Sequence, residues 1–260
     1  MRIKFLQKKY YKVAINSFLI AAFAYLLKNI TNILLARNLS MGLYGDFTIG
    51  VKTFAIISTL LLLGSGNAAE KFLPDYIYTH DSHSAKGYVS WNFKLIFFSN
   101  LIFIVFLLLF ITLLLILHLF NIKSLMSYHL TIYLLFLVPF GSFVLLLSQY
   151  LLSNRNVYWY NFLHNAAKYI LYLHMLLPAI YFLNIVLTQV SLLSIMFIVF
   201  FVLAIFEYIL TAKKLPYFIS FSNNKLRNVK NNNLQWKRTS FKFIINSVVF
   251  YSSRYRIFIL

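Results

Sequence analysis

Residues 42–76 read GLYGDFTIGVKTFAIISTLLLLGSGNAAEKFLPDY: a short turn, one hydrophobic helix and then a segment rich in small and charged residues. The apolar run is long enough to cross a bilayer, which takes about 20 residues. Lys52 lies inside that run, and burying its ammonium group in hydrocarbon costs several kcal/mol. The stretch therefore predicts a membrane-spanning helix whose lysine requires a polar environment.

The composition of the whole chain is that of a membrane protein. Of its 260 residues, 61% are hydrophobic and 11% are charged, whereas soluble domains are about 25% charged. The formal net charge is +19, but most cations flank apolar runs, where topology and anionic lipid headgroups explain them. We therefore expect membrane lipids as partners and no nucleic acid. The chain has no cysteine, which excludes disulfides and thiolate metal sites.

Six apolar runs are long enough to be transmembrane helices. They lie near residues 13–35, 47–65, 95–120, 131–153, 168–187 and 191–212. The predicted fold class is all-α, a polytopic transmembrane helical bundle of six spans plus a partial seventh. Pro139 and Gly141 predict a kink in the fourth run, and Pro178 predicts a bend in the fifth.

The chain divides into three regions by composition. Residues 1–212 are expected to form the six-helix bundle. Residues 213–242 mix asparagine with cations and are expected to form a basic cytoplasmic connector. Residues 243–260 begin like a seventh span that Arg254 and Arg256 interrupt, so we expect them to be the start of a truncated second bundle.

Cations are distributed unequally between the two sides of the predicted bundle. Only Arg37 and Lys123 fall on one side, whereas the cations of the N-terminus, of the loops after the second and fourth runs, and of the segment after the sixth fall on the other. The positive-inside rule therefore predicts a cytoplasmic N-terminus.

The first two runs each carry a lysine on a face of small and polar residues. These faces comprise Ser17, Ala21, Tyr25, Lys28 and Asn32 in the first run, and Thr48, Lys52, Ala55 and Thr59 in the second. Spacings of three and four residues align side chains on one side of a helix. Either the two lysines extend to the membrane interface, or they line a wet cavity that attracts an anionic substrate.

Glu207 is the only acid well inside an apolar run. It lies about 7 Å from the cytoplasmic end of the sixth run. We expect it to pair with Lys213 or Lys214, or to reach the interface, in preference to acting as a proton relay.

No pattern in the sequence indicates an enzyme. His80, Asp81 and His83 lack further ligands for a metal, and His164 and His174 are expected to be packing or interface residues. The sequence contains no phosphate-binding glycine loop, Ser/His/acid set or paired carboxylates. We therefore predict no catalytic, cofactor-binding or metal-binding residues.

Two segments resemble a known family. Leu35-Ala36-Arg37 followed by Tyr44-Gly45, with GSGNAAEKFLPDY at residues 64–76, resembles the first two spans of the polysaccharide flippase family. That family belongs to the multidrug, oligosaccharidyl-lipid and polysaccharide exporter superfamily. Residues 150–170, YLLSNRNVYWYNFLHNAAKYI, are similar to its linker between spans four and five. The resemblance rests on order and spacing.

The resemblance implies a flippase in the bacterial cytoplasmic membrane. Such a transporter moves lipid-linked oligosaccharides, often linked to undecaprenyl diphosphate, for surface polysaccharide biosynthesis. It implies substrate-binding roles for Lys28 and Lys52, with Arg37 near the outer mouth and Asn32 and Tyr25 on the same face as Lys28. A diphosphate-linked sugar is anionic, so its charge is opposite to that of these cations.

Family members have two bundles that face each other across a cleft, whereas this chain supplies one lobe of that exporter-type fold. A cleft with one wall cannot alternate its access. We therefore expect either a truncated product or a half-transporter that pairs with a second chain.

Two other functions stay open at this point. One is a multi-pass membrane enzyme or an accessory subunit of polysaccharide assembly, although the predicted outer loops are short and nearly free of acids. The other is a drug exporter of the same superfamily, which would favour intramembrane acids over lysines.

Overall fold

The computed structural model describes residues 2–79, 81–119, 129–182 and 187–215. Within these residues all regular structure is helical, with no strand. The elements are α1 (Arg2–Asn38), α2 (Met41–Leu61), α3 (Ser65–Tyr78), α4 (Ser82–Leu119), α5 (His129–Leu135), α6 (Val138–Ser153), α7 (Val157–Asn161), the π-helix η2 (Phe162–Ala167), α8 (Lys168–Tyr181) and α9 (Gln189–Lys214). The predicted all-α class is confirmed. Residues 216–242 of the predicted connector, the predicted second bundle and Lys123 lie outside the described residues.

Three helices, α1, α4 and α9, are long and apolar enough to cross a membrane. The pair α2 and α3, bent by 46°, makes a fourth candidate if it forms one broken span. These long apolar helices indicate a multi-pass membrane protein. The count of six spans stays a prediction.

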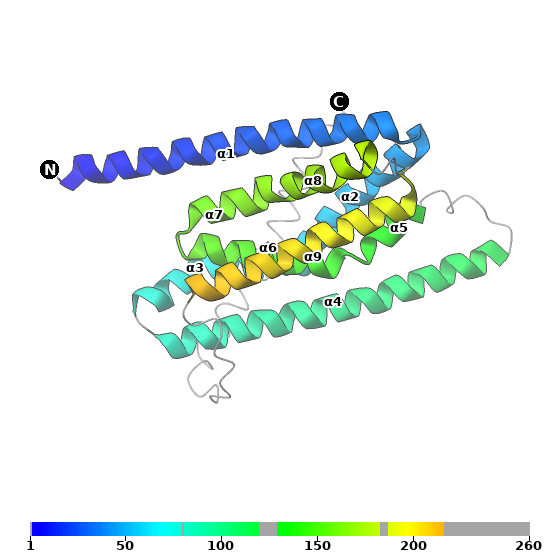
Figure 1. The fold of residues 1–260 in the computed structure, drawn as a ribbon. Helices are drawn as coiled ribbons and strands as arrows, with labels where there is room; N and C mark the ends of the chain where they lie inside the picture. The colour runs from blue at the N-terminus through cyan, green and yellow to red at the C-terminus, as the bar shows by residue number, and fades with distance from the viewer. Residues whose placement is uncertain (1, 80, 120–128, 183–186, 216–260) are drawn as a thin grey trace, which may run out of the picture.

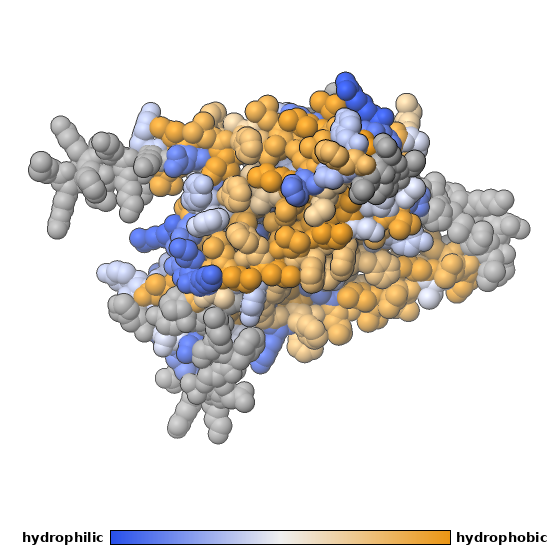
Figure 2. Space-filling model, viewed as in Figure 1, coloured by the Kyte–Doolittle hydropathy of each residue, from blue (hydrophilic) through white to orange (hydrophobic). Residues whose placement is uncertain are grey.

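The helices run roughly along one direction, with α1 and α4 as long outer members on opposite sides of the bundle in Figure 1. Between them, α6 contacts α2, α3 and α9, and α8 contacts α1 and α9. Hydrophobic side chains cover most of the face drawn in Figure 2. On α4, Phe97, Phe106 and Leu109 are exposed, as expected for side chains that face lipid.

The segment after the second apolar run differs from the expectation of a loop. It forms helix α3, and the chain turns into it through Leu63 and Gly64, which have φ angles of 48° and 73°. Glycine adopts this left-handed conformation without a steric penalty. Ala69 and Leu73 are then buried, and α3 packs against α6 and α4. Burial of this small-residue face explains why the segment is helical.

The fourth run is broken where the kink is predicted. Helix α5 ends at Leu135 and α6 begins at Val138, with Pro139 in its first turn, where proline needs no hydrogen-bond partner for its nitrogen. The fifth run begins earlier than predicted, because α7, η2 and α8 continue one another from Val157. Lys168 therefore lies inside a continuous helical segment instead of at its start.

Helix α4 is attached to the bundle by hydrogen bonds along its first half. The Tyr88 hydroxyl donates to the Ser65 carbonyl at 3.1 Å, and the Ser99 hydroxyl donates to the Leu61 carbonyl at 3.0 Å. The Asn100 amide donates to the Ser142 hydroxyl at 2.9 Å. Polar side chains that bond between helices stabilise membrane bundles, so these contacts join α4 to α2, α3 and α6.

Candidate functional site

The five residues predicted to bind substrate all lie on exposed surface. They are Tyr25, Lys28, Asn32, Arg37 and Lys52. The buried side of α1 instead contains Ala24, Thr31 and Leu35. On α2 the buried residues include Gly50, Phe54 and Ser58, which leaves Lys52 on the opposite side.

Lys28 and Lys52 are not joined by any hydrogen bond or ion pair among the residues that the structure describes. Helix α1 packs mainly along α7, η2 and α8 and touches α2 over a short stretch. A cavity wall shared by these two lysines stays a prediction.

The charges of Lys28 on α1 and of Lys168 at the start of α8 act on each other, and the two helices that carry these lysines pack together. Burial is the main influence on the imidazole of His164 in η2, and the charge of Lys168 also acts on it. We call these three residues, Lys28, His164 and Lys168, the basic seam. It follows the contact between α1 and the continuous segment α7–η2–α8.

Local structure holds the basic seam in position. The Asn161 amide donates to the Ser17 hydroxyl at 2.8 Å and so ties the end of α7 to α1. The ring of Tyr160 stacks on His164 with 5.3 Å between ring centroids. The Nζ atom of Lys168 lies 5.2 Å from the centroid of the Tyr169 ring, a cation–π contact. π-Helical turns such as η2 occur often at functional sites.

No acid balances the basic seam in the part of the chain that the structure describes. Within the described part of the chain, no Asp or Glu forms an ion pair with Lys28, His164 or Lys168. Like charges that act on each other across a contact between helices repel, and burial removes hydration from Lys168. A bound anion reduces both costs, so the seam has the chemistry of an anion-binding site.

Sequence reasoning identified Lys28 but missed its neighbours. His164 and Lys168 are four residues apart, which places them on one face of a helix. Their spacing was visible, but the predicted fifth span began at Lys168 and therefore separated the two residues. The sequence pattern instead predicts Lys168 at the edge of the membrane, in the loop after the fourth run.

The expectation for Glu207 is wrong. Its side chain is fully buried, and its hydrogen-bond partner is the Ser148 hydroxyl of α6, which lies 3.1 Å from Oε1 and 3.2 Å from Oε2. Lys213 and Lys214 are exposed on the last turn of α9. The rotation of α9 directs Glu207 at α6, because the same face carries Met196, Val199 and Leu203 into the core.

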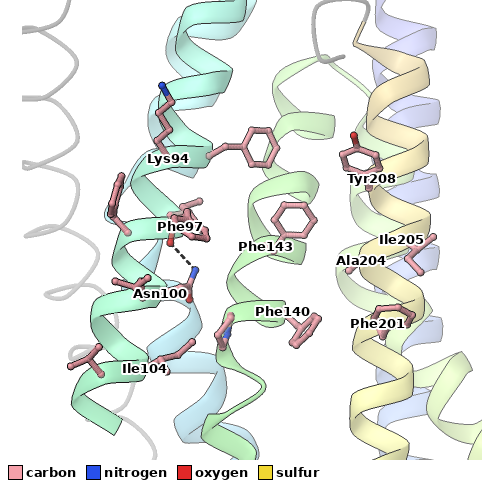
Figure 3. A pocket seen from close by; sticks show the side chains of 16 residues that line it. Lys94, Phe97, Asn100, Ile104, Phe140, Phe143, Phe201, Ala204, Ile205 and Tyr208 are labelled. Atoms are coloured by element: carbon pink, nitrogen blue, oxygen red, sulfur yellow. Dashed lines mark hydrogen bonds between the residues drawn. The ribbon is translucent and has the colours of Figure 1, made fainter. Parts of the chain in front are cut away.

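A groove of about 1280 Å³ lies between α4 and α9, and side chains of α6 also line it (Figure 3). Its walls are mainly apolar and include Phe97, Phe140 and Phe201, while Lys94 and Tyr208 lie toward one end. In the view of Figure 1, α4 lies on the side of the bundle opposite to α1. The groove and the basic seam therefore do not form one site.

Comparisons of the chain with protein-family models, with curated proteins and with solved structures found no match.

Proposed function

We propose that this chain is one lobe of a membrane transporter, a flippase that moves an anionic lipid-linked oligosaccharide for surface polysaccharide biosynthesis. The observation that supports this proposal is the basic seam, in which the charges of Lys28 and Lys168 act on each other and neither has an acid partner among the described residues. A diphosphate group offers several acceptor oxygens to lysine ammonium groups. The resemblance of residues 35–76 and 150–170 to the flippase family supports the same class of substrate.

The proposed lobe has six passes in the bacterial cytoplasmic membrane. In addition to α1, α4, α9 and the bent pair α2–α3, the segments α5–α6 and α7–η2–α8 would each form one pass. Alternating access needs a second wall opposite the first. We propose that a second lobe supplies that wall.

Neutralising the basic seam is expected to weaken binding of a lipid diphosphate. Lys28→Gln and Lys168→Gln should each lower affinity roughly ten- to a hundredfold, because a charge-assisted hydrogen bond contributes roughly 1.5–3 kcal/mol. The measurement is binding of a polyprenyl diphosphate to the purified chain in lipid nanodiscs. An uncharged polyprenol should bind equally to the native chain and to both variants.

Lys94→Gln is the matched control, because Lys94 is an exposed lysine of α4 in the apolar groove. It should leave affinity for the diphosphate unchanged. If Lys94→Gln weakens binding as much as the seam variants do, the effect is a general loss of charge and the site is wrong. Lys52→Gln tests the shared wall predicted from sequence, since a loss equal to that of Lys28→Gln would place Lys52 in the same site.

The proposed orientation has the N-terminus in the cytoplasm. A reporter fused after Leu39 should then lie on the outer side of the cytoplasmic membrane. A reporter fused after Thr79 should lie in the cytoplasm, because α2 and α3 together make one pass. The same result at both positions would show that α2–α3 does not span.

A further inference from the structure

Glu207 occupies an unusual position for an acid. Its side chain has no exposed surface, and it lies between α9 and α6 in a bundle of apolar helices. An ionised carboxylate in such a place costs several kcal/mol unless a cation or several donors compensate it. The charge state of Glu207 therefore has to follow from its surroundings.

No cation compensates Glu207 within the described residues. Lys214 is seven residues further along α9, about 10 Å along the helix axis, and is exposed. Other titratable or charged side chains lie on α9 and on the elements packed against it. They include Tyr133 of α5, Tyr150 of α6, His164 of η2, Lys168 and Tyr172 of α8, and Lys213 and Lys214 of α9.

The geometry with Ser148 suits a carboxyl group that carries a proton. The Ser148 hydroxyl is nearly equidistant from both carboxyl oxygens of Glu207. A hydroxyl has one proton to donate and can also accept. It can therefore donate to one oxygen of a protonated Glu207 and accept from the other, so that both groups are satisfied without a net charge.

The same site is poorly suited to a metal cation. Hard cations need about six oxygen ligands, whereas among the described residues the Ser148 hydroxyl is the only hydrogen-bond partner of the Glu207 carboxyl. Both residues lie inside regular helices, where backbone carbonyls already accept hydrogen bonds. Among the described residues, no group of three His, Cys, Asp or Glu could hold a metal.

We propose that Glu207 is a proton-binding site: its carboxyl carries a proton while α9 packs against α6, and water accepts that proton when the two helices separate. The carboxylate then remains on Glu207 in a hydrated environment, and repacking of the helices requires that a proton returns. Thr211, one turn further toward the end of α9, is buried, and its hydroxyl has no partner among the described residues. The Thr211 hydroxyl is therefore a polar group between Glu207 and the C-terminal end of α9.

The composition of the chain allows a direct test. Its only glutamates are Glu70 and Glu207, so labelling glutamate with ¹³C at the side-chain carboxyl gives two NMR signals from the full chain in lipid nanodiscs. Glu70 is exposed, and Glu70→Gln therefore assigns its signal without changing the core. At neutral pH the remaining signal should have the chemical shift of a protonated carboxyl, although a glutamate in water titrates near about 4.3.

Ser148→Ala and Ser153→Ala form a matched pair on α6. Ser153 is also buried, but its hydroxyl donates to the Tyr150 carbonyl at 2.8 Å. The Ser148 hydroxyl can bond to both forms of Glu207, but its bond to the ionised carboxylate is the stronger one. Removing the hydroxyl should therefore raise the titration midpoint of Glu207, by up to about one pH unit. Ser153→Ala should leave the midpoint unchanged.

Two results would overturn the proposal. One is a carboxylate chemical shift for Glu207 at neutral pH, which would mean that it is ionised in the packed bundle. The other is a change of the Glu207 signal on adding sodium at constant pH, which would make the site a cation site. The measurement does not use substrate, so its outcome is independent of whether the basic seam binds a diphosphate.

Discussion

Gly141→Leu should prevent normal packing of α2 against α6. It should lower the thermal unfolding midpoint of the protein more than Gly42→Leu does. A Cβ atom at position 141 would overlap the ring of Phe54 and lie 2.6 Å from the Ser58 hydroxyl oxygen. Phe54 is buried and packs edge-on against Phe200 at 4.8 Å, so its ring has little room to move. Overpacking of this kind costs about 1–3 kcal/mol, and more when the backbone must shift.

The control for this variant is Gly42→Leu in the first turn of α2. Gly42 is exposed, and a Cβ atom there would meet nothing within 4 Å. The two variants add the same side chain, and thermal unfolding in detergent micelles compares them. Equal midpoints would show that α2 and α6 do not approach each other at Gly141.

Asp46→Ala should destabilise the contact between α2 and α5 by roughly 2–4 kcal/mol, because one buried and one partly buried N–H group lose their acceptor. The carboxylate of Asp46 accepts from the backbone N–H of Leu130 at 2.9 Å and of Thr131 at 3.2 Å. The Thr131 hydroxyl also donates to the carboxylate and, at 3.0 Å, to the Asp46 carbonyl. Asp46 thus caps the first turn of α5 from another helix, and a negative charge there is favourable.

Asp75→Ala provides the comparison, since Asp75 is an exposed acid of α3. The free energy of unfolding, measured by denaturant titration in micelles, should fall for Asp46→Ala and stay nearly constant for Asp75→Ala. The free energy of unfolding of Asp46→Asn should be intermediate between those of Asp46→Ala and Asp75→Ala, because the amide keeps one acceptor oxygen but loses the charge. An Asp46→Ala protein as stable as Asp75→Ala would mean that α5 does not depend on this cap.

Part of the fold follows directly from the sequence. The apolar runs predict the long helices, and the proline at position 139 predicts the break between α5 and α6, because both signals act within a few residues. Helix α3 was missed because its glycine- and asparagine-containing start resembles a loop. Its helical state depends on burying Ala69 and Leu73 against neighbouring helices, which local propensity does not report.

The candidate site was predicted only in part for a related reason. Helical spacing places Lys28 on a polar face of α1, but it does not say which helix lies beside that face. Lys28 and Lys168 are far apart in the chain, yet their charges act on each other in the folded protein. This arrangement depends on α1 packing along α7, η2 and α8, and the early start of the fifth helical segment places Lys168 inside that segment instead of at its beginning.

By itself, the sequence determined that this chain is an all-helical membrane protein with an excess of cations, because hydrophobic run length and charge are properties of consecutive residues. Only the tertiary structure decided which polar groups meet: Asp46 with the start of α5, Lys28 with Lys168, and Glu207 with Ser148. Helix periodicity determines the angle of a side chain about its own axis. The rotation and neighbours of each helix are determined by close contacts such as that at Gly141. Lys52, in the stretch of residues 42–76, was therefore recognisable as a lysine inside an apolar helix, but its place on the side of α2 away from Phe54 became visible only in the packed bundle.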